Sequence, residues 1–234
     1  MSTFTLITER LLERTLYSHR KAAHDFGGPL IVSISPEEIY HTYAERRHRK
    51  TSRNKLLFNA QFVRLFYHGN WDKHLVPFEN GDPYKNIKDL YMHRDDYTQS
   101  NRFNVLVQAL QAGKPHFKKG YDLSSMQGIH AYCGGYVKMF DSMESEGYKL
   151  DAGQDTCKIA ITSRGEIVKW SHNGFNRLAA AKILNIETIH VEVVRIHPEW
   201  MHQFGGAKPK NLRTAIASVE SRRLSEKARF GTDT

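Results

Sequence analysis

The chain has 234 residues, 40% of them hydrophobic and 11% aromatic, so it can bury a core as one large domain or as a domain with an insert. No run approaches the apolar length of a membrane span, and the N-terminal residues are too charged for a secretory signal, which predicts a soluble, cytoplasmic protein that does not bind membranes. The formal net charge is +9, which favours a polyanionic partner and excludes an acidic, solvating chain.

The N-terminal segment is predicted to be mainly helical. Residues 1–28 form an expected helical extension, because leucines recur there at roughly helical spacing. A short apolar strand follows at residues 30–34. The next helix is predicted to start at Ser35, with Ser35 as N-cap, Pro36 at the first position and Glu38 at the capping-box position.

The middle of the chain is predicted to be a helical insert of about residues 84–130. Residues 84–112 are polar and helical in pattern, and residues 114–130 are loop-like. A second helix is expected over residues 132–146, where apolar side chains recur on one face, and Gly147 is expected to close it.

The clearest local patterns lie near the C-terminal end. Residues 158–170 alternate around a tight turn at residues 163–166, which predicts a β-hairpin. Residues 175–184 are rich in Ala and Leu and predict a helix, closed by Asn185 in the left-handed conformation. A further strand is expected from residue 189. The fold class is therefore α/β (α+β), with too few strands and no alternating βαβ series for a doubly wound sheet.

Positive charge is concentrated in two stretches. Residues 41–64 hold seven Lys/Arg against one Glu, a net of +6, and residues 207–234 hold seven against three acids, a net of +4. Aromatic residues interleave with the first stretch, which favours contact with a nucleic-acid backbone and bases. A solvated helix face and a solubilising tail are the alternative. The candidate nucleic-acid-binding residues are Arg46, Arg47, Arg49, Lys50, Arg53 and Lys55. The tail, residues 205–234, has a helical patch at residues 212–230 and is expected to be mobile or ordered by a partner.

The order of the motifs resembles the ParB/sulfiredoxin superfamily over about residues 30–200. The early strand with Pro36, the hairpin, the turn and helix HNGFNRLAAAKILNI and the closing strand ETIHVEVVRIHPEW follow the family's order. The sequence GNWD, which ends at Asp72, and RIHPEW, which starts at Arg195, resemble the "GdWD" and "RHxxW" elements of an uncharacterised ParB-like subgroup. The resemblance implies one family domain at residues 29–204, built on a small mixed sheet of the ParB/sulfiredoxin type.

The start of the helix at residue 175 is the candidate phosphate site. A helix start presents free N–H groups, and an Arg in its first turn adds donors suited to phosphate. The resemblance implies a nucleoside di- or triphosphate there, together with Mg²⁺. The candidate phosphate-binding residues are His172, Asn173, Gly174, Asn176 and Arg177. Asn173 and Asn176 depart from the acid and the His that the family usually has, and Phe175 stands where sulfiredoxin has its catalytic Cys, which argues against that activity.

Asp72 is the candidate catalytic base, because phosphoryl transfer needs a carboxylate near the acceptor hydroxyl and the family acid at residue 173 is absent. A turn or cap role is the alternative. Arg195 and His197 are candidate contacts to substrate or phosphate. The histidines show no ligand spacing typical of zinc, so no protein metal site is predicted. Cys133 and Cys157 are expected to be reduced, buried thiols.

Three functions follow from these patterns. The first is a kinase-like, nucleotide-dependent phosphotransferase (ATP, ADP or CTP) whose acceptor hydroxyl is a small molecule or lies on nucleic acid. The alternative is a ParB-like DNA- or RNA-binding protein, switched by nucleotide or acting as a nuclease. A further alternative is a non-catalytic member that keeps the fold as an interaction module.

Overall fold

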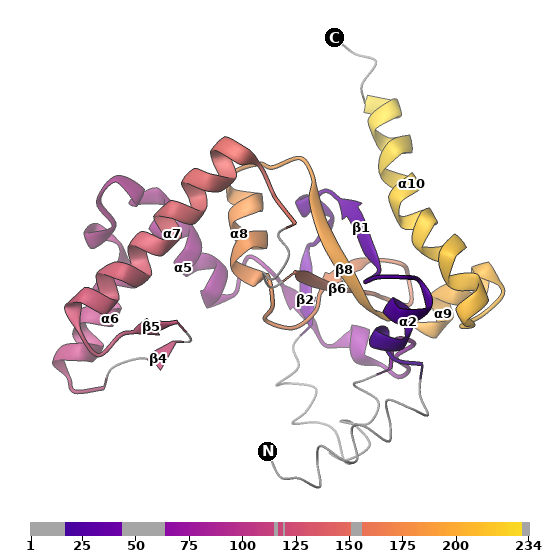
Figure 1. Ribbon diagram of the computed structural model, residues 1–234, viewed down its shortest axis with the longest axis horizontal. Helices are drawn as coiled ribbons and strands as arrows, with labels where there is room; N and C mark the ends of the chain where they lie inside the picture. The colour runs from indigo at the N-terminus through magenta and orange to yellow at the C-terminus, as the bar shows by residue number, and fades with distance from the viewer. Residues whose placement is uncertain (1–16, 44–63, 115–116, 119, 151–155, 231–234) are drawn as a thin grey trace, which may run out of the picture. The chain divides into compact units, whose positions relative to one another are not determined.

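The computed structural model describes residues 17–43, 64–114, 117–118, 120–150 and 156–230. Within them the chain divides into two compact units (Figure 1). The sheet unit comprises residues up to 78, residues 150–175 and residues from 187 onward. The helical unit comprises residues 79–149 and 176–186. The described residues contain seven α-helices and a six-stranded mixed sheet, which confirms the α/β class.

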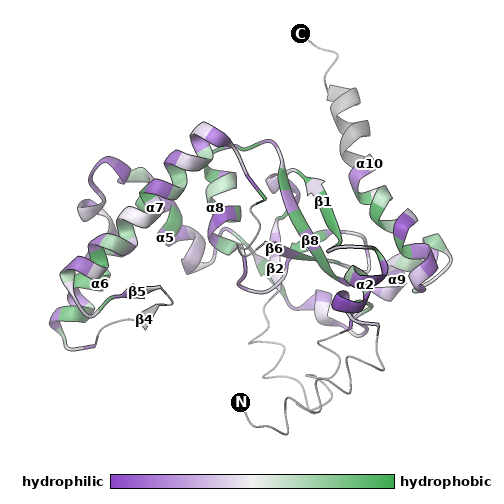
Figure 2. Ribbon diagram, in the orientation of Figure 1, coloured by the Kyte–Doolittle hydropathy of each residue, from purple (hydrophilic) through white to green (hydrophobic). Residues whose placement is uncertain are grey.

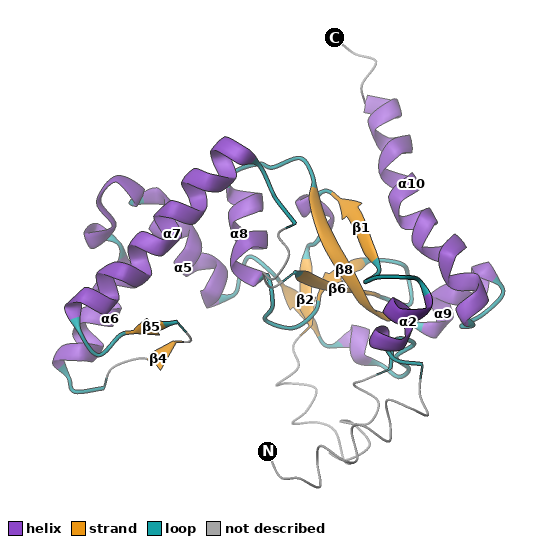
Figure 3. Cartoon of the chain, viewed as in Figure 1, coloured by secondary structure: helices purple, strands orange, loops and turns teal. Residues whose placement is uncertain are grey.

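All six strands of the main sheet belong to the sheet unit. Strands are drawn in orange in Figure 3. Their order is β1-β8-β6-β7-β2-β3. The β6–β8 and β7–β2 pairs are parallel, and the other three pairs are antiparallel. The strands are β1 (Ile31–Ile34), β2 (His41–Tyr43), β3 (Leu75–Pro77), β6 (Cys157–Ile161), β7 (Ile167–Lys169) and β8 (Ile189–Ile196). The predicted hairpin is confirmed as β6–β7, and the predicted closing strand as β8.

The central strands are buried on both faces, as strands with parallel neighbours usually are. In β8, six of the eight residues are buried, and Figure 2 shows hydrophobic residues along most of it. The first half of helix α10 (Leu212–Phe230) packs on β1 and buries Leu212, Ala215 and Val219. The sequence predicts a tail that is mobile or ordered by a partner. This part of the tail instead packs into the core of the sheet unit.

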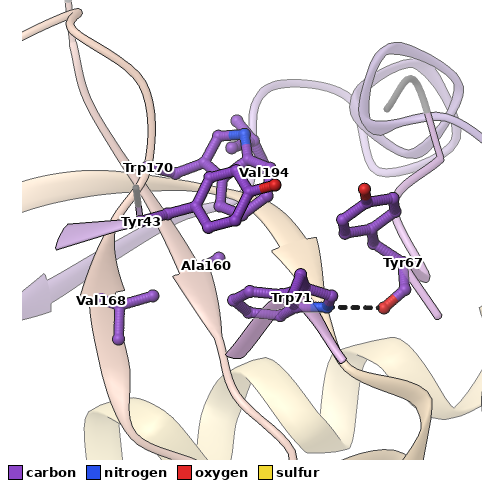
Figure 4. Close-up of a cluster of buried hydrophobic side chains, with 7 residues drawn as sticks. All are labelled: Tyr43, Tyr67, Trp71, Ala160, Val168, Trp170 and Val194. Atoms are coloured by element: carbon purple, nitrogen blue, oxygen red, sulfur yellow. Dashed lines mark hydrogen bonds between the residues drawn. The ribbon is translucent and has the colours of Figure 1, made fainter. Parts of the chain in front are cut away.

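An aromatic cluster anchors the segment that carries Asp72 (Figure 4). Tyr43 and Trp170 stack with ring centroids 4.2 Å apart, and Trp71 meets Trp170 edge-on at 5.2 Å. The Trp71 Nε1–H donates to the Tyr67 carbonyl at 2.9 Å, so its one polar atom is satisfied. Because Trp71 is fully buried, the neighbouring Asp72 is held at a fixed place beside the sheet.

The shorter elements of the sheet unit connect these strands. They are α2 (His19–Asp25), the 3-10 turns η1 (Pro36–Glu38), η2 (Trp71–Lys73), η4 (His202–Phe204) and η5 (Pro209–Asn211), and the helix α9 (Pro198–Met201). Within residues 17–28, the predicted helical extension is helical at α2. No described helix is both long and apolar enough to cross a membrane.

The helix predicted to start at Ser35 is wrong. The capping box of Ser35 and Glu38 is present, but it opens only the single turn η1. The chain then enters β2 at His41. Burial of Ile39 and Tyr43 against the sheet stabilises the extended chain more than local propensity stabilises a helix.

The helical unit contains more structure than the sequence predicts. Its elements are α5 (Asp82–Met92), η3 (Arg94–Gln99), α6 (Asn101–Gln111), the strands β4 (Phe117–Lys118) and β5 (Tyr121–Asp122), α7 (Met126–Glu146), and α8 (Phe175–Ile183) from residue 176 onward. Helix α7 starts six residues before the predicted position, because the Ser125 side chain caps the Gly128 N–H. The predicted closures are confirmed: Gly147 has φ 73° and Asn185 has φ 53°.

Candidate functional site: the Asp72 cavity

The sheet unit holds a cavity of about 870 Å³, which we call the Asp72 cavity. Three segments line it: the η2 region at residues 68–73, the β6–β7 turn at residues 162–166, and the start of α9 at residues 197–202. Its charged lining consists of Asp72, Glu166, Glu199, Lys73 and Arg164. Three histidines add polar ring nitrogens to the lining: His68, His197 and His202. A cavity of this size and polarity fits a small, polar ligand.

Asp72, the predicted base, lies on the wall of this cavity and pairs with Ser163. The Asp72 Oδ2 accepts the Ser163 Oγ–H at 2.5 Å and the Ser163 N–H at 3.2 Å. The two residues are 91 positions apart, so the sheet brings them together. The sequence predicted the turn at Ser163 but gave no signal of this contact.

His197 also lines the cavity, and its contacts show what holds it. Its Nε2 lies 2.9 Å from the Gly69 carbonyl, and its Nδ1 accepts the Glu199 N–H at 3.3 Å. These partners require the neutral ring with the proton on Nε2, because a carbonyl accepts and a backbone N–H donates. His197 therefore caps α9 and fixes two walls of the cavity. Burial lowers the pKa of the nearby His68, and the charge of Arg64 lowers it further.

Arg195, a predicted substrate contact, is buried away from the cavity lining. Its guanidinium lies 5.7 Å from the ring centroid of Trp170 and donates to the Val194 carbonyl. Burial lowers the pKa of Arg195 to about 10. His19 lies beside it at 3.4 Å, and burial together with the Arg195 charge lowers the pKa of His19 to about 4. Arg195 therefore packs inside the sheet unit and does not line the cavity, and its contact to substrate or phosphate stays a prediction from sequence.

The predicted phosphate turn has a structural reason for its glycine. Gly174 has φ 69°, in the left-handed region, and a Cβ there would lie 2.4 Å from the Cα of Cys157. Only glycine allows the turn to lie so close to β6. Its presence is therefore explained without a phosphate. His172 is exposed, and its carbonyl accepts the Phe175 N–H at 3.2 Å.

A buried lysine, which the sequence prediction missed, holds this turn. The Lys169 side chain is fully buried, and its ammonium donates into four carbonyl oxygens. The acceptors are Asn173 at 2.6 Å, Trp170 at 2.8 Å, and Lys158 and Ser171 at 3.1 Å each. Burial lowers the pKa of Lys169, whereas the carbonyl oxygens stabilise its charged form. The sequence does contain one indication of this role, because Lys169 is the only charged residue in the apolar strand β7.

In the helical unit, the two remaining phosphate candidates are engaged by protein groups. The Asn176 Nδ2 donates to the Tyr136 hydroxyl at 2.8 Å. The Arg177 guanidinium stacks 4.4 Å from the Tyr148 ring centroid and donates to the Lys149 carbonyl. Both side chains therefore have protein partners that explain their positions, and their phosphate role stays a prediction from sequence.

Asp72 and the Gly174 turn lie at opposite ends of β6. Gly174 packs on Cys157, the first residue of the strand, whereas Ser163 is the second residue after its end at Ile161. A strand rises 3.2–3.4 Å per residue, so β6 spans about 13 Å. Proton transfer needs a contact of about 3 Å. Within the sheet unit, Asp72 is therefore too far from the Gly174 turn for direct proton transfer to a group held there, and a phosphate role for residues 173–177 stays a prediction from sequence.

Two predictions lie outside these sites. The six candidate nucleic-acid-binding residues, from Arg46 to Lys55, lie outside the described residues, and so this prediction stays one from sequence. Within residues 17–43, 64–114, 117–118, 120–150 and 156–230, no group of three or more His, Cys, Asp or Glu is placed to hold a metal ion. Cys133 and Cys157 are buried, reduced thiols, as predicted.

Comparison of the chain with protein-family models, with curated proteins and with solved structures finds no match. The resemblance to the ParB/sulfiredoxin superfamily therefore stays a prediction from the order of the motifs. The function has to be argued from the site itself.

Proposed function

We propose that this chain transfers a phosphoryl group from a nucleotide to a hydroxyl, and that the transfer takes place in the Asp72 cavity. The observation that carries the proposal is the position of Asp72, which Ser163 fixes on the wall of a polar cavity. Two positively charged side chains, Lys73 and Arg164, line the same cavity. In this proposal the nucleotide binds in the Asp72 cavity as a substrate. The turn at Gly174 has a supporting role.

Asp72 has the properties of a base for an acceptor hydroxyl. Both bonds from Ser163 end on Oδ2, and Oδ1 has its own lone pairs for the hydroxyl of a ligand. The buried Trp71 beside it prevents the carboxylate from moving away. A base held in place at hydrogen-bond distance is the requirement for proton transfer.

Lys73 and Arg164 supply positive charge for the phosphates. Each directly follows a member of the Asp72–Ser163 pair, and both side chains are exposed on the cavity lining. An arginine can hold two phosphate oxygens at once, and a lysine acts as a point charge. In the reaction the acceptor oxygen bonds to phosphorus, the bond from phosphorus to the leaving oxygen breaks, and the acceptor proton passes to Asp72.

The test is turnover of labelled ATP, ADP and CTP by the full chain with Mg²⁺ and a panel of hydroxyl-bearing metabolites. Asp72→Asn should lower the rate by about 10²–10⁴-fold while nucleotide binding is kept, because general base catalysis contributes about that much. Asp122→Asn is the matched control, since Asp122 binds Ser124 at the same distance outside the cavity. No binding or turnover of any nucleotide would refute the proposal.

A second comparison locates the phosphates. Lys73→Ala and Arg164→Ala should weaken nucleotide binding about tenfold or more, whereas Arg177→Ala should leave it unchanged. The reverse pattern would place the phosphates at the turn and would separate the phosphate site from Asp72.

A further inference from the structure

We infer that Ser163 is itself a phosphoryl acceptor, so that the chain carries a phosphoserine in the Asp72 cavity. The inference rests on the proposed function and names the first acceptor of the same site. The first observation is that the Ser163 hydroxyl already donates a hydrogen bond to the Asp72 carboxylate, which would take its proton.

The Ser163 hydroxyl has its proton acceptor in place. Its Oγ lies 2.5 Å from Asp72 Oδ2, the range of a charge-assisted bond from a hydroxyl to a carboxylate. The same oxygen accepts the Ser163 N–H at 3.2 Å, so both residues are fixed relative to each other. A nucleophile within hydrogen-bond reach of a base is the arrangement that activates a hydroxyl.

The bond alone does not identify an acceptor, because the chain has a matched pair elsewhere. The Ser124 Oγ donates to Asp122 at 2.5 Å, and the Ser124 N–H donates to the same oxygen at 3.0 Å. That pair is two residues apart and exposed, as in an ordinary Asx turn. The Asp72–Ser163 pair differs in its surroundings: it joins distant segments at a cavity that has room for a nucleotide phosphate chain.

The charged side chains around Ser163 suit a phosphoryl group that is bound for a short time and then transferred to another hydroxyl. Lys73 and Arg164 lie on the lining and attract a phosphoryl group. Glu166 and Glu199 lie on the same lining and repel it. A phosphoserine there is stabilised on one side and opposed on the other, which favours transfer to a second hydroxyl over storage.

The step balances with a nucleoside triphosphate as co-reactant. The Ser163 Oγ forms a bond to the γ-phosphorus, and the bond from that phosphorus to the β,γ-bridging oxygen breaks. The nucleoside diphosphate leaves with the electron pair of that bond. The Ser163 proton passes to Asp72 Oδ2, and in a second transfer an external hydroxyl can take the phosphoryl group in the same way.

The experiment incubates the full chain with γ-labelled ATP or CTP and Mg²⁺, without any acceptor, and maps the label by mass spectrometry. We expect a gain of one phosphoryl group on the peptide that contains Ser163. Ser163→Ala should abolish the label and Asp72→Asn should lower its rate by at least tenfold. Ser124→Ala should keep it, because its hydroxyl lies outside the cavity.

Folding is controlled by comparing thermal melts, and by Ser163→Thr, which keeps a hydroxyl and should give a phosphothreonine. Label on another residue, or an undiminished label in Ser163→Ala, overturns the inference. Turnover of nucleotide with no label at Ser163, even after rapid quenching, overturns it and leaves the proposed function standing. If no nucleotide is bound or turned over, both fail.

Discussion

Removal of the Lys169 ammonium tests the account of the 170–174 turn most directly. The variant Lys169→Met keeps the length and apolar stem of the side chain and removes only the charge. Four carbonyl oxygens within 3.1 Å then lose their shared donor. The ammonium is fully buried and its acceptors belong to buried or half-buried residues, so water replaces it poorly unless the turn opens.

The magnitude follows from the contacts. An ammonium has three N–H groups, and a hydrogen bond to a charged group contributes about 1.5–3 kcal/mol, so the contacts contribute roughly 5–9 kcal/mol. Burial of the ammonium costs several kcal/mol in return. The expected net loss for Lys169→Met is about 2–4 kcal/mol in the free energy of unfolding.

Urea unfolding followed by tryptophan fluorescence measures this loss, since Trp170 is the next residue. Lys182→Met is the matched control: Lys182 is also buried, but its ammonium lies 3.2 Å from Glu79, which is half exposed and can be rehydrated. The control should lose about 1 kcal/mol or less. Equal loss in both variants, or a loss under about 0.5 kcal/mol for Lys169→Met, would refute the reasoning.

Three further predictions follow. Gly174→Ala should lower the free energy of unfolding by about 2 kcal/mol or more, because its Cβ would lie 2.4 Å from the backbone of Cys157 at φ 69°; an unchanged urea midpoint would contradict this. Stability should fall as pH drops from 6.5 to about 4, since the unfolded chain binds a proton there that folded His19 does not; after a discount for its partial exposure the effect is about 1–2 kcal/mol, and His19→Gln should remove it from the pH–stability curve. If the basic residues 46–55 bind a nucleic-acid backbone, log affinity should fall with log salt with a slope of about −5, and a flat response would exclude such contacts.

The elements that the sequence predicts well are the ones set by neighbouring residues. The hairpin needs only alternation around the turn at residues 163–166, and the closing of α8 needs only Asn185 after an Ala-rich run. The bounds of α10 also agree with the predicted helical patch at residues 212–230.

Contacts between distant segments could not be predicted in the same way. A capping box at Ser35 starts a long helix or a single turn equally well, and burial of Tyr43 in the aromatic cluster decides between them. The choice of Asp72 as a candidate came from a motif, whereas its partner Ser163 is joined to it only by the folded sheet. The role of Gly174 likewise depends on Cys157, which is 17 residues earlier in the chain.

The strand order has a consequence for synthesis on the ribosome. Only six residues separate β1 from β2 in sequence, but β8, β6 and β7 lie between them in the sheet. Residues up to Pro77 therefore wait for the chain to reach Ile196 before the sheet can close. At about 5–20 residues per second the delay is roughly 6–24 s. Through this interval the edges of β1 and β2 are open to other chains, and a chaperone that covers extended segments would raise the yield of folded protein.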